Sequence, residues 1–119
     1  MDKVKSVSGY WIKPGQEVPE KHRFLPLLKS LNDTLGGQPE MLRVRLRSGK
    51  RIVVIESMDA AMQGRDYNFT ICVVPMDRKT FIDILGDAII LGRDDEDNFT
   101  DIELTEDEMV ELISWPYEK

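Results

Sequence analysis

The segment MLRVRLRSGKRIVVIE, residues 41–56, has the clearest β-hairpin pattern in the chain. Its first half alternates leucine and valine with three arginines, which is the period of a strand that buries one face. A Ser48-Gly49 turn signal follows, and the apolar run at residues 52–55 is typical of a strand with neighbours on both sides. The stretch therefore predicts a β-hairpin, and a two-residue loop would place Arg45 opposite Ile52.

Strand and helix signals continue on both sides of this hairpin. One expected helix has Pro26 in its first turn and ends at the Gly36-Gly37 pair. A second expected helix begins with a capping box of Thr105 and Glu108. A charged polar connection is expected to precede the first helix. The expected strands cover residues 7–12, 67–73, 88–91 and 99–104, and the expected helices cover residues 26–35 and a segment from about 106 with Met109, Leu112 and Ile113 on its core face.

Residues 76–92 allow two interpretations. Asp77 can cap a helix over residues 78–85 that stops at Gly86, and we expect this arrangement. In the alternative, Gly86-Asp87 is the two-residue loop of a hairpin between residues 81–84 and 88–91.

The length and composition indicate one α+β domain over residues 1–119. A chain of 119 residues with 41% hydrophobic and 32% charged residues has the size and balance of an ordinary globular domain. The patterns above give a mainly antiparallel sheet of five or six strands and two or three short helices. The N-terminus has no apolar signal stretch and no run approaches the ~20 apolar residues of a membrane span, so a cytoplasmic protein with no membrane partner is expected.

Charge is distributed unevenly along the chain. Residues 1–75 contain twelve Lys and Arg against eight Asp and Glu, whereas residues 76–119 contain four against fourteen. Such an acidic end repels anionic partners and accelerates the association of basic ones. A solvated face that only keeps the protein in solution is the alternative.

The residue inventory argues against catalysis. The chain has one histidine, His22, and one cysteine, Cys72, so a His-activated nucleophile or a typical zinc site is not expected. Counted from Asp95, the acidic run has Phe99 at position five and Thr100 at position six, where an EF-hand loop requires an acidic ligand and a glycine. The glycines do not match a phosphate loop or a dinucleotide fingerprint. We therefore expect a protein that is not an enzyme and that has no metal or cofactor.

The hairpin carries a candidate basic surface. Arginines at alternate positions of a strand project from one face about 7 Å apart, a spacing that can follow phosphates along a nucleic acid. We expect Asp101 and Glu103, at alternate positions of a later strand, to oppose these cations and neutralise them. The residues of this alternative nucleic-acid-binding surface are Arg43, Arg45, Arg47, Lys50 and Arg51.

Four segments resemble Sm-like RNA-binding proteins. They are Pro26-Leu27-Leu28 with Leu31, the pattern Leu42-x-Val44-x-Leu46-x-x-Gly49, Asp59-Ala60-Ala61-Met62-Gln63, and Leu85-Gly86 to Gly92, which resembles the family's second motif. The chain departs from that pattern at Val54, Gln63 and Leu91, where the family has a glycine, an asparagine and an arginine. The resemblance implies an oligomeric ring that binds single-stranded RNA.

The acidic C-terminal region is the other candidate surface. Dense carboxylates beside aromatic rings suit a protein partner with a basic surface, since charge guides the encounter and rings anchor the complex. We therefore interpret the protein as a non-enzymatic interaction domain of the acidic inhibitor, immunity-protein or phage-antagonist kind. Its expected partner-binding residues are Asp94, Asp95, Glu96, Asp97, Glu106, Asp107, Glu108, Glu111, Trp115 and Tyr117.

Overall fold

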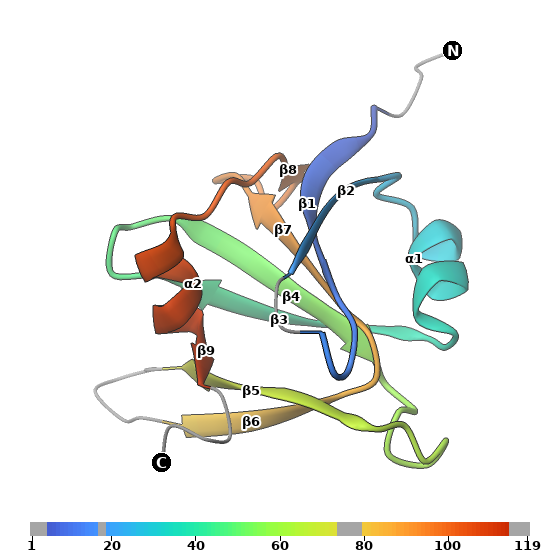
Figure 1. Ribbon diagram of the computed structural model, residues 1–119. Helices are drawn as coiled ribbons and strands as arrows, with labels where there is room; N and C mark the ends of the chain where they lie inside the picture. The colour runs from blue at the N-terminus through green and yellow to red at the C-terminus, as the bar shows by residue number, and fades with distance from the viewer. Residues whose placement is uncertain (1–4, 17–18, 74–79, 115–119) are drawn as a thin grey trace.

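The computed structural model, which describes residues 5–16, 19–73 and 80–114, is an α+β domain with two antiparallel sheets and two short helices (Figure 1). The predicted α+β class and the mainly antiparallel sheet of six strands are confirmed, and a second sheet of three strands adds to them. In chain order the elements are β1 (Val7–Ile12), β2 (Glu20–Phe24), α1 (Leu28–Leu35), β3 (Pro39–Arg45), β4 (Arg51–Ser57), β5 (Tyr67–Val73), β6 (Thr80–Leu85), β7 (Ala88–Arg93), β8 (Phe99–Thr100), α2 (Glu106–Leu112) and β9 (Ile113–Ser114).

The larger sheet has the strand order β2-β1-β7-β4-β3, and β8 extends it by pairing with β7. The hairpin of β3 and β4 is confirmed, and β4 has neighbours on both sides, as its apolar run predicts. Ile52, Val53, Val54 and Ile55 are all almost completely buried.

The hairpin register differs from the prediction by one residue. Arg45 lies opposite Arg51 and Val44 opposite Ile52, because the loop is longer than two residues. The Gly49 N–H donates to the Leu46 carbonyl at 2.8 Å, and Gly49 takes a φ of 95°. The loop of this hairpin therefore has three residues, 47–49, and its last residue is the left-handed glycine.

Residues 80–85 are a strand, so the expected helix over residues 78–85 is wrong within the described residues. Ile82 and Ile84 face the core while Asp83 is exposed, a period of two, and β6 pairs with β5. The hairpin alternative is also wrong in its pairing, since β7 joins the other sheet beside β1 and β4. Pairing with β5 therefore overrides the local helix signals. Asp77, the expected cap, lies outside the described residues.

The chain crosses from the small sheet, β6-β5-β9, to the large one at Gly86 (Figure 1). Gly86 has a φ of 73° and donates its N–H to the Asp66 carbonyl. The buried Asn68 amide donates to the carbonyls of Ile12 and Gly86, each at 2.8 Å. This polar junction ties the two sheets together at one end.

Two apolar clusters fill the domain, one on each face of the large sheet. The cluster between the sheets joins Val44, Ile52 and Ile90 to Phe69 of β5 and Leu112 of α2. The cluster on the opposite face packs α1 against the sheet and contains Val7, Phe24, Leu31, Leu35, Val53, Ile55, Ile89 and Leu91.

The region before α1 is more ordered than its polar sequence suggested. Glu20–Phe24 is an edge strand paired with β1, and α1 begins only at Leu28, two residues after Pro26. Gly36 ends the helix with a φ of 74°, as expected. Neither helix of the described residues is long and apolar enough to cross a membrane.

Candidate functional site

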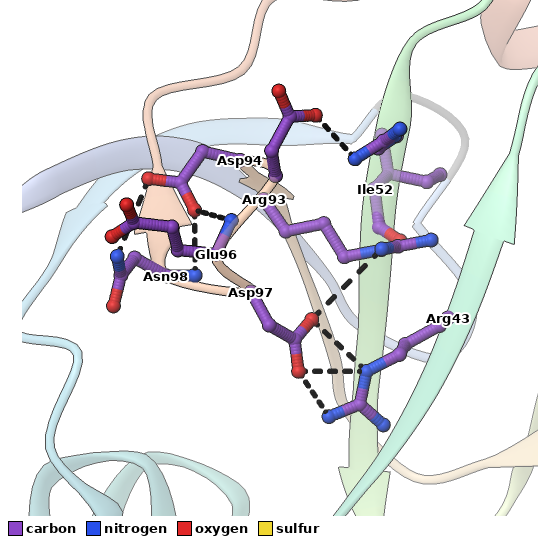
Figure 2. Close-up of polar contacts among 9 residues, drawn as sticks. Arg43, Ile52, Arg93, Asp94, Glu96, Asp97 and Asn98 are labelled. Atoms are coloured by element: carbon purple, nitrogen blue, oxygen red, sulfur yellow. Dashed lines mark hydrogen bonds and ion pairs between the residues drawn. The ribbon is translucent and has the colours of Figure 1, made fainter.

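Residues 94–98, which connect β7 to β8, form an acidic loop whose conformation is organised by its first residue, Asp94 (Figure 2). Asp94 Oδ1 accepts hydrogen bonds from the N–H groups of Glu96 and Asn98, both at 2.9 Å. The hydrogen bond from the Asn98 N–H is the main reason that the pKa of Asp94 is lowered. Asp97 adopts a left-handed φ of 65°, the only such value at a non-glycine residue in the described part of the chain. Asp94 therefore has a structural role within the loop.

Two of the loop's carboxylates turn back onto arginines of the sheet. Asp97 Oδ2 lies 2.6 Å from Arg43 Nη2, and Asp97 Oδ1 lies 3.9 Å from Arg93 Nη1 (Figure 2). The hydrogen bonds from Arg43 are the main reason that the pKa of Asp97 is lowered. Asp95 forms an ion pair with Arg51. The predicted acidic and basic surfaces thus partly neutralise each other.

The carboxylates expected to oppose the arginines have other partners. Asp101 Oδ1 accepts from the Ser8 N–H at 2.7 Å, and Ile102 N–H donates to the Ser8 carbonyl. Glu103 forms an ion pair with Lys21 at 2.7 Å. The expected pairing with the hairpin is therefore wrong.

The cause is the short length of β8. The expected strand over residues 99–104 ends at Thr100, and the chain then bends onto β1. Gly92 permits this path, since a Cβ there would lie 2.9 Å from the Asp101 carbonyl oxygen.

The helix α2 begins with the predicted capping box. The Glu108 N–H donates to Thr105 Oγ1, and Glu108 Oε1 accepts from the Thr105 N–H at 3.0 Å. The same carboxylate is nearly buried and also binds Lys50 and Ser48 of the hairpin. Glu111 accepts from the Arg47 N–H at 2.8 Å. Glu108 and Glu111 thus fasten α2 to the hairpin loop.

Three of the predicted partner-binding carboxylates remain on the surface without such contacts. Glu96, Glu106 and Asp107 are exposed, and none of them forms an ion pair with a described residue. Trp115 and Tyr117, the expected aromatic anchors, lie outside the described residues.

The basic surface is also divided by the fold. Lys50 points to α2, where its ammonium binds Glu108 and the Glu103 carbonyl. Arg43 and Arg51 hold the acidic loop. Arg45 and Arg47 are exposed, and their side chains have no carboxylate partner among the described residues. The cations do not form one continuous comb along β3.

His22 lies on β2, in contact with two aromatic rings. Its ring centroid is 5.2 Å from that of Trp11 and 4.9 Å from that of Phe24. Within the described residues there is no group of three or more His, Cys, Asp or Glu side chains that could hold a metal ion.

Comparisons of the chain with protein families, with curated proteins and with solved structures find no match.

Proposed function

We propose that this protein is a non-enzymatic interaction domain that binds a basic surface of a protein partner through its acidic C-terminal region. The observation that carries the proposal is an excess of carboxylates. Between Asp94 and Glu111 the chain has ten acidic residues and no basic one. In the described structure only four of them form ion pairs, namely Asp95, Asp97, Glu103 and Glu108.

The binding surface follows from which carboxylates the fold already uses. Asp94 and Asp97 make contacts within the acidic loop or from it to the sheet, and Glu108 and Glu111 fasten α2, so these four carboxylates are already engaged within the domain. We assign the partner contact to the acidic face, defined as Glu96, Glu106 and Asp107. Exposed charge of this kind guides encounter and has its main effect on the association rate.

The same face suits a protein partner better than a nucleic acid, because carboxylates repel phosphates. The ion pairs of Arg43, Lys50 and Arg51 with carboxylates also reduce the positive potential of the hairpin. These two observations favour the protein-binding function over the nucleic-acid-binding one.

The test starts with identification of the partner. The tagged protein is used to capture proteins from its source cells, and each captured protein is purified for binding measurements. A variant with Glu96→Gln, Glu106→Gln and Asp107→Asn keeps every contact described above. We expect it to bind the partner several-fold more weakly at low salt and to lose this difference at high salt.

A matched control variant carries Glu20→Gln, Asp33→Asn and Asp66→Asn, which change the net charge equally at exposed positions outside the acidic face. Equal binding by the two variants would refute the proposal, because net charge rather than the acidic face would then decide binding. A complex that forms only with RNA or DNA would also refute it.

A further inference from the structure

Three arginines from neighbouring strands form a row across one face of the large sheet. Arg45 of β3 lies opposite Arg51 of β4. Arg93 of β7 follows Gly92, the partner of Ile52, so it lies beside Arg51 at the end of that ladder. Directly opposed side chains in a sheet have Cβ atoms about 5 Å apart, a distance at which like charges repel.

A fourth arginine completes the group, which we call the arginine row. Arg43 lies two residues before Arg45 on β3 and therefore on the same face. Its guanidinium shares Asp97 with Arg93 (Figure 2). Arg93 cannot be assigned to this row from the sequence alone, because only the strand order brings β7 beside β4.

The acidic loop supplies too few carboxylates for this row. Asp97 serves Arg43 and Arg93, and Asp95 serves Arg51. Arg45 has no carboxylate partner among the described residues, so three guanidinium groups share two carboxylates and the fourth has none. The other two acidic groups of the loop, Asp94 and Glu96, form no ion pair with the row, and Asp94 is turned into the loop itself.

The carboxylates of these ion pairs are open to solvent, whereas the side chains of Arg51 and Arg93 are only 31% and 19% exposed. The side chains of Arg43 and Asp97 are 53% and 45% exposed, and that of Asp95 is 90% exposed. Guanidinium groups bind phosphate oxygens in pairs, as they bind carboxylates, and phosphate carries more charge.

We propose that the arginine row is a binding site for a phosphate group and that the carboxylates of Asp95 and Asp97 are its internal competitors. An incoming phosphate displaces the acidic loop and places its oxygens between Arg45 and Arg51. The site is independent of the proposed protein partner, since it uses cations on the sheet rather than the acidic face.

The experiment follows the side-chain Nε–Hε signals of the arginines by nuclear magnetic resonance during titration with inorganic phosphate, with chloride keeping the ionic strength constant. We expect saturable shifts at Arg45 and Arg51. Asp97→Asn should bind phosphate about 1.5- to 5-fold more tightly, the range that corresponds to loss of one exposed ion pair. Arg45→Gln should weaken binding.

Matched variants make the result specific. Asp66→Asn removes an exposed carboxylate outside both the loop and the acidic face, and Arg47→Gln removes an exposed arginine outside the row. Both should leave phosphate affinity unchanged, and backbone spectra check that each variant is folded. A parallel titration with a short single-stranded RNA tells whether the phosphate group belongs to a nucleic acid or to the free ion. Saturation at a lower concentration of phosphate groups with RNA than with inorganic phosphate assigns the site to a nucleic-acid backbone. Saturation at the same concentration assigns it to free phosphate.

Two results would overturn the proposal. One is a set of shifts that stay linear with phosphate and are equal in the native protein and Arg45→Gln, which indicates screening without a site. The other is an Asp97→Asn variant that is folded and binds phosphate no more tightly than the native protein.

Discussion

Lys50 and Glu108 form an ion pair that joins the hairpin of β3 and β4 to the first turn of α2. The Lys50 Nζ lies 2.7 Å from Glu108 Oε1, and only 10% of the Glu108 side chain is exposed. The Lys50 ammonium, the Thr105 N–H and the Ser48 hydroxyl, in that order, lower the pKa of Glu108 to about 2. One carboxylate thus caps a helix and positions it on the sheet.

Glu108→Gln should therefore lower the melting temperature at neutral pH. Because the pKa of Glu108 is lower in the folded protein than its usual 4.5, its contribution is fully present above pH 4.5 and is lost as the pH falls toward 2. The difference between native protein and variant should shrink over that interval in thermal unfolding curves. Asp107→Asn, in the same helical turn but exposed, should have a smaller effect, and an equal effect would contradict this role of Glu108.

Glu56 should have the opposite pH dependence. Burial, with a smaller contribution from Glu40 on the adjacent strand, raises its pKa to about 7. The folded protein then binds the proton more tightly than the unfolded chain, so stability should fall as the pH rises from about 4.5 to 7.

Glu56→Gln should remove that part of the pH dependence and stabilise the protein above pH 7 by about 1–2 kcal/mol, a value reduced from the full pKa shift because the side chain is only partly buried. Glu40→Gln should act in the same direction but less. Urea unfolding at pH 5 and pH 8 measures both effects, and a variant that is less stable than the native protein at pH 8 would contradict the account.

Gly9 should not tolerate a side chain. A Cβ at this position would lie 2.2 Å from the Ile90 carbonyl oxygen, in the pairing of β1 with β7. Gly9→Ala should destabilise the fold by about 3 kcal/mol or more, since backbone must move. Gly49→Ala has open space and only an unfavourable φ of 95°, so it should cost about 1–2 kcal/mol. Chemical denaturation of the two variants should rank them in this order.

The sequence was sufficient for the elements whose signals are local. The alternation in β3, the apolar run of β4 and the Thr105–Glu108 capping box all have the predicted structure. The pattern of residues 80–85 allows either a helix or a strand, as short apolar segments often do, and pairing with β5 makes this segment a strand.

The partners of charged groups could not be predicted, because they depend on strand order. Arg43 binds Asp97 rather than Asp101, since β8 ends after two residues and the chain turns to Ser8. Arg93 joins the arginine row only because β7 lies beside β4. Composition identified the acidic and basic regions, but the tertiary fold determined which of their residues remain available.

The Arg43–Asp97 pair should contribute little to stability despite its short distance. Both side chains are about half exposed, so a double-mutant cycle of Arg43→Ala and Asp97→Asn should give about 0.2–1 kcal/mol, decreasing as salt is added. Arg45→Ala removes no ion pair with a described carboxylate and should change stability by less than about 0.5 kcal/mol. A coupling energy well above this range that persists in high salt would contradict the view that the acidic loop exchanges readily.

The most direct test of the central claim is the association rate constant of the captured partner, measured by surface plasmon resonance at several salt concentrations. The variant of Glu96, Glu106 and Asp107 should associate about 3- to 10-fold more slowly than the native protein at low salt. Its dissociation rate should be little changed, and the control variant of Glu20, Asp33 and Asp66 should stay close to the native protein. An association rate that is the same for the native protein and both variants at every salt concentration would contradict the claim that the acidic face binds the partner.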